Sequence, residues 1–569
     1  MSDKIEYDVL LVGGSLSNLT LAYRLIELTN SPVRIALIEK GLHIGNHLIS
    51  GALSNPRVIK KLFHDWETGG LPIEGICKES FLRIVGVKGW TDVPSGLTPP
   101  YFKKEGYAIL SISEVAKYMA AKIKEKAGAK TGVVVDIYPG FAGREIIYDG
   151  SRVAGVRVDE TVIPSQDICY AKVVVFGDKG FLSRDLIQKF SLRKRGQTYA
   201  AGVKEIWEVN ENYEGKVWHT IGYPLAAGHI GGGFIYGCRD NKVIIGEVMG
   251  LDFAAPNIRP QQVLQDFKKH PFVQKIIRGG KLLKYGASVL PEGGYYALPE
   301  SFAVDGAMMV GDALGTLDVK RFSGVDKAME SGYIAAEVIV NALAKNDTSA
   351  STLNTFKQKF MDSWAGQELY DSRYFRHTFH KYPGILDFFI PGVIKKLGEG
   401  NGLKSAGIYT ALSHPFASLR MLGAQKMIER PSDKGPVTYP EDRSYIKPSY
   451  DNTNRVKSTG FDPATLYTTA DVVFYAHTYY GEDSEHIDEF NKETCLNCIK
   501  QYDAVKKDTP CVGDCTANVH QTQEKDGRRY HAMDIENCVQ CRTCEIVCPY
   551  MNLRVNAAPY GYGPDFTGL

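Results

Sequence analysis

Eight of the eleven cysteines of this 569-residue chain lie between Cys495 and Cys548. Four of them form the run "CVQCRTCEIVCP", in which Cys538, Cys541, Cys544 and Cys548 are spaced C-x2-C-x2-C-x3-C-P. This is the bacterial ferredoxin pattern, in which three thiolates bind one iron–sulfur cluster and the fourth binds another. Structural zinc is the less favoured alternative, because C-x2-C-x2-C is unusual for tetrahedral zinc. The C-terminal part of the chain is therefore predicted to fold around metal.

At the N-terminal end, "DVLLVGGSLSNLT" combines a buried-strand pattern, a glycine turn and the start of a helical pattern. This order is typical of a dinucleotide-binding domain, whose fingerprint is Gly-x-Gly-x-x-Gly. Here the three positions hold Gly13, Ser15 and Asn18. The next strand pattern ends in Glu39, which suits an adenosine ribose, although an ordinary strand-end carboxylate is the alternative. Because a serine hydroxyl and free helix N–H groups also suit a phosphate, the two replacements weaken the motif without abolishing it.

Two later strand patterns also end in glycine and aspartate. "GAMMVGDALG" ends its strand in Gly311 and Asp312, and Gly324 leads into a long amphipathic pattern. "AKVVVFGDKG" has Gly177 and Asp178 at the equivalent place. A carboxylate and N–H groups at such strand ends suit a flavin ribityl chain and a flavin carbonyl. Each stretch alone is as consistent with scaffold as with a binding site.

The overall composition is that of a globular protein, and a formal net charge of +2 gives no reason to expect a nucleic-acid partner. The polar N-terminus enters a strand directly, so no secretory signal is expected. No apolar run reaches the ~18–20 residues that span a bilayer. The strongest apolar segment, residues 383–397, contains Asp387 and Pro391, which argue against a spanning helix. Its pattern leaves room for a segment lying in the membrane surface, although a core helix is the more usual interpretation of such a pattern alone.

The domain organisation is predicted from changes in pattern along the chain. Strand-like and helix-like patterns alternate over residues 1–430, which predicts an α/β body. Residues 431–470 begin with a stretch rich in proline, charge and polar side chains and are predicted to be a linker. Residues 471–569 then form the predicted iron–sulfur domain.

Several stretches together resemble the electron-transfer flavoprotein:quinone oxidoreductases, among them "EKGLHIGNHLISGALSNPRVIKKLF", "QTYAAGVKEIWEV", "GGGFIYG" and "GYGPDFTGL". The resemblance covers nearly the whole chain and is weakest between about 400 and 490. It implies a Rossmann-like FAD-binding domain of the glutathione-reductase type and a C-terminal α+β ferredoxin-like domain. It also implies an interleaved α+β domain that faces the quinone and the membrane, mainly within residues 80–135, 200–290 and 360–430. The implied cofactors are FAD and a [4Fe–4S] cluster, with ubiquinone or menaquinone as the acceptor.

The resemblance also assigns cofactor contacts. Gly13, Glu39 and Asp312 become FAD contacts, and Gly324 lies at the turn nearest the isoalloxazine ring. The family has glycine where this chain has Ser15 and Asn18. We therefore predict that the Ser15 hydroxyl donates to the pyrophosphate and that Asn18 displaces the helix slightly. The full predicted set of cofactor-binding residues is Gly13, Gly14, Ser15, Ser17, Asn18, Glu39, Lys40, Gly311, Asp312, Gly324 and Val325.

The cysteines depart from the family in a patterned way. The family has one cluster and no cysteine at the position of Cys548, whereas this chain adds an upstream group that mirrors the downstream run. Exchanging the fourth ligands of the two groups leaves no cysteine over. The first predicted cluster has Cys515, Cys538, Cys541 and Cys544, and the second has Cys495, Cys498, Cys511 and Cys548. The alternative for the second group is unligated thiols or a zinc site, with His520 and His531 as further zinc ligands.

The family's quinone pocket lies between the FAD and a membrane-facing surface. This implies that Gly231 and Gly232 lie near the quinone head, although a simple strand bulge is the alternative for such glycines. It also implies that the chain is a peripheral (monotopic) membrane protein, expected at the cytoplasmic face. The predicted membrane-surface residues are Ile385, Leu386, Phe388, Phe389 and Ile390.

The expected enzyme passes electrons from reduced electron-transfer flavoprotein through the cluster or clusters and FAD to a membrane quinone. No catalytic side chain is needed for this reaction, because the cofactors carry the electrons. One alternative is a geranylgeranyl-reductase-like FAD enzyme fed by its own ferredoxin domain, which the fused cysteine module and "GYGPDFTGL" argue against. The other is a non-enzymatic electron-relay subunit, which Glu39 and the Gly311-Asp312 strand end argue against.

Overall fold

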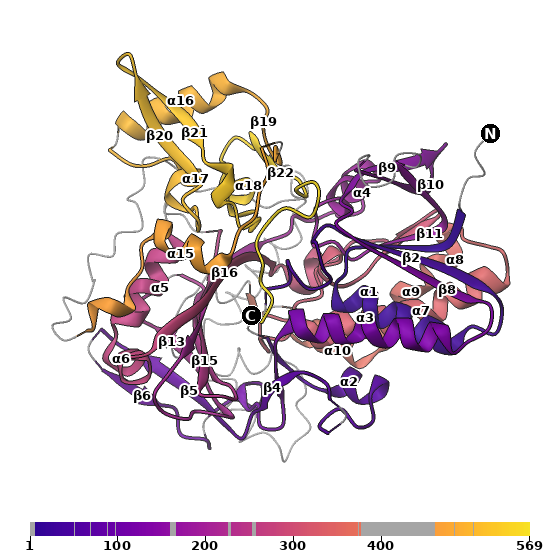
Figure 1. The fold of residues 1–569 in the computed structure, drawn as a ribbon, viewed down its shortest axis with the longest axis horizontal. Coiled ribbons are helices and arrows are strands. Elements are labelled where there is room, and N and C mark those ends of the chain that lie inside the picture. The colour runs from indigo at the N-terminus through magenta and orange to yellow at the C-terminus, as the bar shows by residue number, and fades with distance from the viewer. Residues whose placement is uncertain are drawn as a thin grey trace, which may run out of the picture.

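The computed structural model describes residues 6–376, except 50–51, 69, 88, 97, 160–166, 226–228, 253–257 and 374, and residues 461–568, except 483 and 505. One large sheet and its helices lie on the right of Figure 1, and a second large sheet lies on the left. The cysteine-bearing C-terminal segment lies above the second sheet in this view. Among the described residues, no helix combines the length and apolar character that crossing a membrane requires.

The first sheet contains five parallel strands in the order β18-β11-β1-β2-β8. The antiparallel strand β17 extends it at one edge, and β9 and β10 leave β11 as an antiparallel meander. The bounds are β1 (Glu6–Val12), β2 (Val33–Glu39), β8 (Val133–Pro139), β9 (Gly143–Asp149), β10 (Arg152–Val158), β11 (Ile168–Phe176), β17 (Ala303–Val304) and β18 (Ala307–Met309). The central strands are almost fully buried, as parallel strands covered by helices are.

Helices pack on the first sheet, and α1 lies against both α3 and α7. The bounds are α1 (Leu16–Leu28), α2 (Arg57–Leu62), α3 (Ile112–Gly128), α4 (Ser183–Lys189), α7 (Val325–Ala344), α8 (Ala350–Leu353), α9 (Thr355–Asp362) and α10 (Trp364–Asp371). The stretch 80–135, predicted for the quinone-facing part, is therefore divided, because α3 packs against α1 while strands β5 and β6 belong to the second sheet.

The second sheet has seven strands in the order β16-β12-β15-β14-β13-β5-β6, antiparallel except for the β5–β13 pair. The bounds are β5 (Glu79–Val85), β6 (Trp90–Asp92), β12 (Tyr199–Glu208), β13 (Lys216–Gly222), β14 (Gly231–Gly237), β15 (Lys242–Gly250) and β16 (Lys281–Pro291), with helices α5 (Pro260–Lys269) and α6 (Pro271–Ile277). A fully buried ion pair of 2.8 Å joins Lys268 of α5 to Glu205 of β12. A small sheet has the order β3 (Ala52–Ser54), β7 (Ala108–Leu110) and β4 (Ile73–Ile76).

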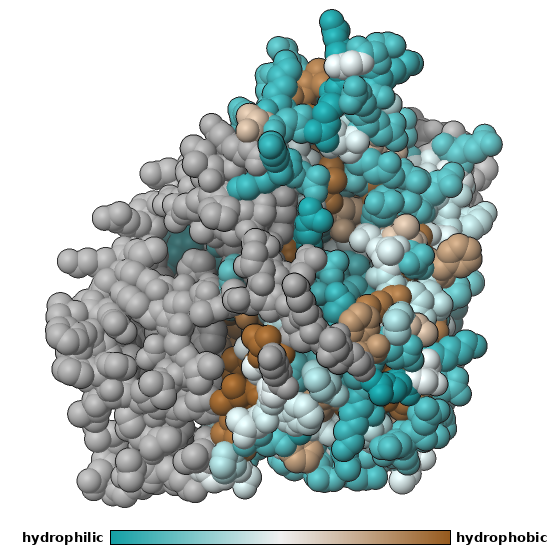
Figure 2. Space-filling model, turned by 90° about the vertical axis from the view of Figure 1, so that its left-hand side faces the viewer, coloured by the Kyte–Doolittle hydropathy of each residue, from teal (hydrophilic) through white to brown (hydrophobic). Residues whose placement is uncertain are grey.

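The C-terminal segment consists of short helices and two small strand pairs, β19 with β22 and β20 with β21. The bounds are α15 (Thr469–Ala476), β19 (Ile487–Glu489), α16 (Lys492–Ala504), α17 (Pro510–Gly513), β20 (His520–Lys525), β21 (Arg528–Met533), α18 (Thr543–Val547) and β22 (Leu553–Val555). Before α15, the backbone N–H of Asp462 donates to Gln274 of α6 at 2.8 Å. The last residues of the predicted linker, from 461 onward, therefore pack on the body. Figure 2 shows that the described part of the face toward the second sheet is mostly hydrophilic, with apolar residues gathered in a strip near its centre.

Candidate functional site: a cavity between the two sheets and the cysteine segment

A cavity of about 400 Å³ is lined by residues of both large sheets and of the C-terminal segment. Residues of the β1–α1 turn, the end of β2 and the start of α7 line one side. Gly231–Gly233 of β14 line another side. From the C-terminal segment, the cavity is reached by Val539 and Gln540 of the loop 538–544, which carries Cys538, Cys541 and Cys544 and is called the first cysteine loop below. Nine of the eleven predicted cofactor residues line this cavity: Gly13, Gly14, Ser15, Ser17, Glu39, Lys40, Asp312, Gly324 and Val325.

The Glu39 carboxylate is held at the end of β2 by the turn it faces. Its Oε2 accepts a hydrogen bond from the Gly14 backbone N–H at 2.7 Å, and Oε1 accepts one from Gly41 at 2.8 Å. A Cβ at Gly14 would lie 3.1 Å from Oε2, and Gly13 has φ = +93°. Glycine at both positions therefore lets the turn fold tightly beside the acid, and the carboxylate remains at the cavity wall.

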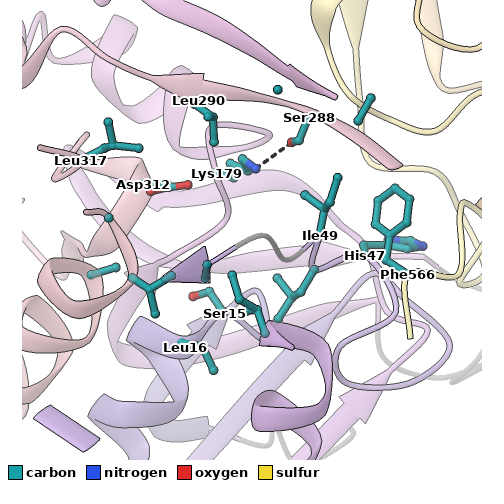
Figure 3. A pocket seen from close by; sticks show the side chains of 18 of the residues that line it. Ser15, Leu16, His47, Ile49, Lys179, Ser288, Leu290, Asp312, Leu317 and Phe566 are labelled. Atoms are coloured by element: carbon teal, nitrogen blue, oxygen red, sulfur yellow. Dashed lines mark hydrogen bonds between the residues drawn. The ribbon is translucent and has the colours of Figure 1, made fainter. Parts of the chain in front are cut away.

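Ser15 and Asn18 take different parts in this turn. Ser15 is the N-cap of α1, lines the cavity (Figure 3), and places its Oγ 2.9 Å from Ser17 Oγ. Asn18 is fully buried, and its Nδ2 donates to the carbonyl oxygens of Val12 at 2.9 Å and Gly13 at 2.8 Å. Asn18 thus fastens the strand end to the helix, a role that its place in the glycine fingerprint did not indicate.

Glycines on neighbouring elements supply the close packing that the fingerprint glycines usually allow. A Cβ at Gly177, after β11, would lie 2.7 Å from Ser15 Oγ and 2.8 Å from Asn18 Nδ2. A Cβ at Gly332 of α7 would lie 2.0 Å from the Ser17 carbonyl oxygen, which explains the close approach of α7 to α1. Behind the cavity wall, Gly311 has φ = +58° and likewise leaves space for Ser17.

Asp312 and Lys179 lie near each other on adjacent strand ends and are half-buried at the cavity wall (Figure 3). Burial raises the pKa of Asp312, and Lys179 opposes that rise. Burial also lowers the pKa of Lys179, whose Nζ donates to Ser288 Oγ of β16 at 2.6 Å. Lys179 therefore joins the first sheet to the second at the cavity. Sequence reasoning noticed the glycines around it and missed the lysine.

Lys40 joins the nucleotide-site side of the cavity to the first cysteine loop. Its Nζ lies 2.5 Å from Gln540 Oε1 and 2.5 Å from His47 Nδ1. Burial lowers the pKa of Lys40 to about 8, against the opposing charge of Glu39. Because Gln540 stands between Cys538 and Cys541, the end of β2 is connected directly to that loop.

The four predicted ligands of the first cluster lie together beside the cavity. Burial and the charges of Cys541 and Cys515 raise the pKa of Cys538 to about 12, and the same neighbours raise that of Cys544. Backbone N–H groups donate to two of the sulfurs, from Gln540 to Cys538 at 3.3 Å and from Val519 to Cys515 at 3.2 Å. The loop is fixed to β16, because the Val289 N–H donates to the Cys541 carbonyl oxygen at 3.0 Å.

Gly231 and Gly232 line the cavity, but neighbouring strands also require them to be glycine. A Cβ at Gly231 would lie 2.2 Å from the Val248 carbonyl oxygen, and one at Gly232 would lie 2.3 Å from that of Thr220. The register of β14 with β15 is continuous, so these glycines do not form a bulge.

Two polar side chains on the same side of the second sheet were not singled out from the sequence. Lys204 and His219 line the cavity and are buried, and Lys204 Nζ and His219 Nδ1 have no hydrogen-bond partner in the described part of the chain. Burial lowers the pKa of Lys204 far below its ordinary value and that of His219 to about 3. His219 Nε2 lies 3.0 Å from the Tyr236 hydroxyl. The only sequence signal was a charge inside an apolar strand pattern.

Comparison with known proteins decides which family this site belongs to. A family model described as ETF-QO, ubiquinone-binding, matches residues 199–290, which include β12–β15 and most of β16. The electron transfer flavoprotein-ubiquinone oxidoreductase of Sus scrofa is 30% identical over 597 residues, covering 99% of this chain and 89% of the relative. The chain belongs to the electron transfer flavoprotein-ubiquinone oxidoreductase family. The predicted family is therefore confirmed.

Solved structures similar to this family member share its α/β fold. A geranylgeranyl bacteriochlorophyll reductase-like protein from Thermoplasma acidophilum has a TM-score of 0.56 at 16% identity, covering 74% of this chain and 99% of that structure. A flavoprotein/dehydrogenase from Cytophaga hutchinsonii has a TM-score of 0.50 at 15% identity, covering 73% and 99%. At this identity the likeness concerns the fold alone. The predicted membrane-surface residues 385–390 lie outside the described residues.

Proposed function

We propose that this chain is a membrane-surface oxidoreductase that passes electrons from reduced electron-transfer flavoprotein to a membrane quinone. The observation that carries the proposal is the shared cavity, which brings together the nucleotide-site turn, the ubiquinone-binding region and the first cysteine loop. When bound, FAD and an iron–sulfur cluster supply carriers for single electrons between the two substrates. The chain's own residues hold these groups and exclude water from the cavity.

The residues around the β1–α1 turn fit FAD. The Glu39 carboxylate keeps acceptor capacity for ribose hydroxyls beyond its two backbone bonds. The N-terminus of α1 and the Ser15 hydroxyl offer donors to the pyrophosphate. Asp312 suits a ribityl hydroxyl, and the backbone at Gly324 and Val325 suits a flavin carbonyl. Gly14 and Gly324 line the wall, where a Cβ would lie 3.1 Å from Glu39 Oε2 and 3.3 Å from Leu317 Cδ1.

The C-terminal segment fits an α+β ferredoxin-like domain around a [4Fe–4S] cluster. Cys515, Cys538, Cys541 and Cys544 provide four thiols in one place, with N–H donors already directed at two of the sulfurs. Such N–H···S bonds stabilise the negative charge on cluster ligands and influence the reduction potential.

For the quinone, we propose a site on the second-sheet side of the cavity, near Gly231 and Gly232. Lys204 Nζ and His219 Nδ1 are buried there and have no hydrogen-bond partner among the described residues. A quinone carbonyl oxygen is a suitable acceptor for Lys204, since an unsatisfied buried donor is costly.

We further propose that residues 383–397 lie in the membrane surface. A vesicle-binding assay with Phe388→Ser/Phe389→Ser tests this through loss of binding.

The deciding experiment is anaerobic reduction of a short-chain quinone by reduced electron-transfer flavoprotein, with FAD content measured on the same sample. We expect FAD to be released on denaturation and quinol to form only when the flavoprotein is present. Reduction of an isoprenoid double bond without quinol formation would instead favour the geranylgeranyl-reductase alternative. Absence of FAD from the purified protein would favour the relay alternative.

A further inference from the structure

The eight C-terminal cysteines separate into two spatial groups, and the second group has no role in the family's single cluster. Cys495 and Cys498 of α16, Cys511 of α17 and Cys548 after α18 line one small pocket together with His531. Cys511 and Cys515 are four residues apart, yet they belong to different groups.

The sulfur environment of the second group repeats that of the first. The backbone N–H of Asn552 donates to Cys548 Sγ at 3.2 Å, four residues after the cysteine. Val519 makes the same bond to Cys515 Sγ, also at 3.2 Å and four residues later. The Asn552 side-chain Nδ2 donates to Cys495 Sγ at 3.1 Å. Two four-cysteine groups with matching donors are therefore packed side by side through α17 and α18.

From this arrangement we propose that Cys495, Cys498, Cys511 and Cys548 bind a second [4Fe–4S] cluster. A zinc site is the competing assignment, because Cys511, His520 and His531 place ligand atoms within 4.8 Å of one another. However, His531 already lies 2.9 Å from Glu489 Oε2 through Nδ1 and 2.9 Å from His520 through Nε2. A zinc ion there would also leave Cys498 and Cys548 unused.

The second cluster is farther from the cavity than the first. Val539 and Gln540, which stand between two cysteines of the first group, line the cavity, whereas no residue of the small pocket around the second group does. Helix α16, which carries two of them, lies at the end of the molecule away from the first sheet (Figure 1). The second cluster is thus a distal carrier of single electrons, an assignment that rests on the proposed function, whereas the metal site itself does not.

The test is the iron, sulfide and zinc content of anaerobically purified full-length protein. We expect about eight iron atoms per chain, no stoichiometric zinc, and a reduced electron paramagnetic resonance spectrum of two interacting centres. Cys498→Ser and Cys548→Ser should each leave about four iron atoms and an isolated-cluster spectrum, with FAD content unchanged. The matched control His531→Gln should keep about eight.

About four iron atoms in the unmodified protein, with or without one zinc, would overturn the second cluster whether or not the variants fold. Eight iron atoms without flavoprotein-driven quinone reduction would leave the cluster in place and overturn the proposed function. Four iron atoms with full activity would overturn the second cluster and leave the proposed function in place.

Discussion

Asn18 of α1 occupies the space that a side chain at Gly177 would need. The Asn18 amide lies 2.8 Å from the position of a Cβ on Gly177, a residue distant in the sequence at the end of β11. The same amide holds the carbonyl oxygens of Val12 and Gly13. Helix α1 lacks the third fingerprint glycine but still packs closely on the sheet. The close contact is possible because the residue that faces Asn18 from the end of β11 is Gly177.

We expect Asn18→Gly, which restores the usual fingerprint residue, to destabilise the protein. The change removes two buried hydrogen bonds and adds backbone freedom to the first turn of α1, which together cost roughly 1–3 kcal/mol. A lower thermal midpoint would show this. Ser15→Gly is the matched control, because glycine is nearly as good as serine at an N-cap and should cost only a few tenths of a kcal/mol.

Gly177→Ala should reduce FAD retention strongly, because the added methyl group meets both Ser15 and Asn18. The cost should be smaller in an Asn18→Gly background, where the space is free. A double-mutant cycle on the thermal midpoint measures this coupling, for which contacting residues typically give about 0.5–3 kcal/mol. Additive effects of the two changes would contradict the shared-space explanation.

The parts of this molecule that the sequence predicted depend on local patterns. The β1–α1 turn, Glu39 at the end of the next strand and the three-cysteine loop each lie within one short stretch, so periodicity and spacing were enough. Glu39 was predicted as a cofactor residue, and it does line the cavity.

The features that the sequence did not predict depend on contacts between residues that are far apart in the chain. Gly332 makes room for α1 from more than 300 residues away, and no local rule indicates this. Lys204 was not singled out from the sequence, yet it is buried and lines the cavity. Asn18 was expected to displace the helix slightly, and its role as a hydrogen-bond donor to the strand end was not predicted.

Lys204→Met should make the protein more stable and the quinone reaction slower. The variant removes a buried amine that lacks a partner among the described residues, so the thermal midpoint without quinone should rise. If Lys204 donates to the quinone, kcat/KM for quinone should fall roughly tenfold. The exposed Lys281 of β16 provides the control Lys281→Met, which should change neither quantity. Unchanged kinetics together with unchanged FAD retention would exclude a ligand role for Lys204.

Lys40→Met should lower the reduction potential of the cluster that we propose at Cys515, Cys538, Cys541 and Cys544. A cation beside Cys538 favours the more negative, reduced state, and the variant removes that cation. Gln540→Leu separates the effect of the Lys40 charge from that of its hydrogen bond. It removes the Gln540 oxygen that accepts from Lys40 and leaves the ammonium group in place. A redox titration followed by electron paramagnetic resonance should show the larger downward shift for Lys40→Met. Equal shifts would mean that the hydrogen bond, and not the charge, sets the potential.

Glu247 of β15 should make stability depend on pH. Both carboxylate oxygens are buried without a hydrogen-bond partner in the described residues, and burial alone raises the pKa of Glu247 well above its ordinary value. Between the unfolded and folded pKa values the folded state holds more protons. The free energy of unfolding therefore falls as pH rises, by about 1.4 kcal/mol per unit.

Glu247→Gln removes this dependence while keeping the size of the side chain. The variant should have the higher thermal midpoint at about pH 8, and the difference from the unmodified protein should shrink toward about pH 5. Glu208→Gln at the exposed end of β12 is the control and should leave the midpoint close to unchanged at both values. A difference that is constant with pH would show that folding does not raise the pKa of Glu247 and that only its packing matters.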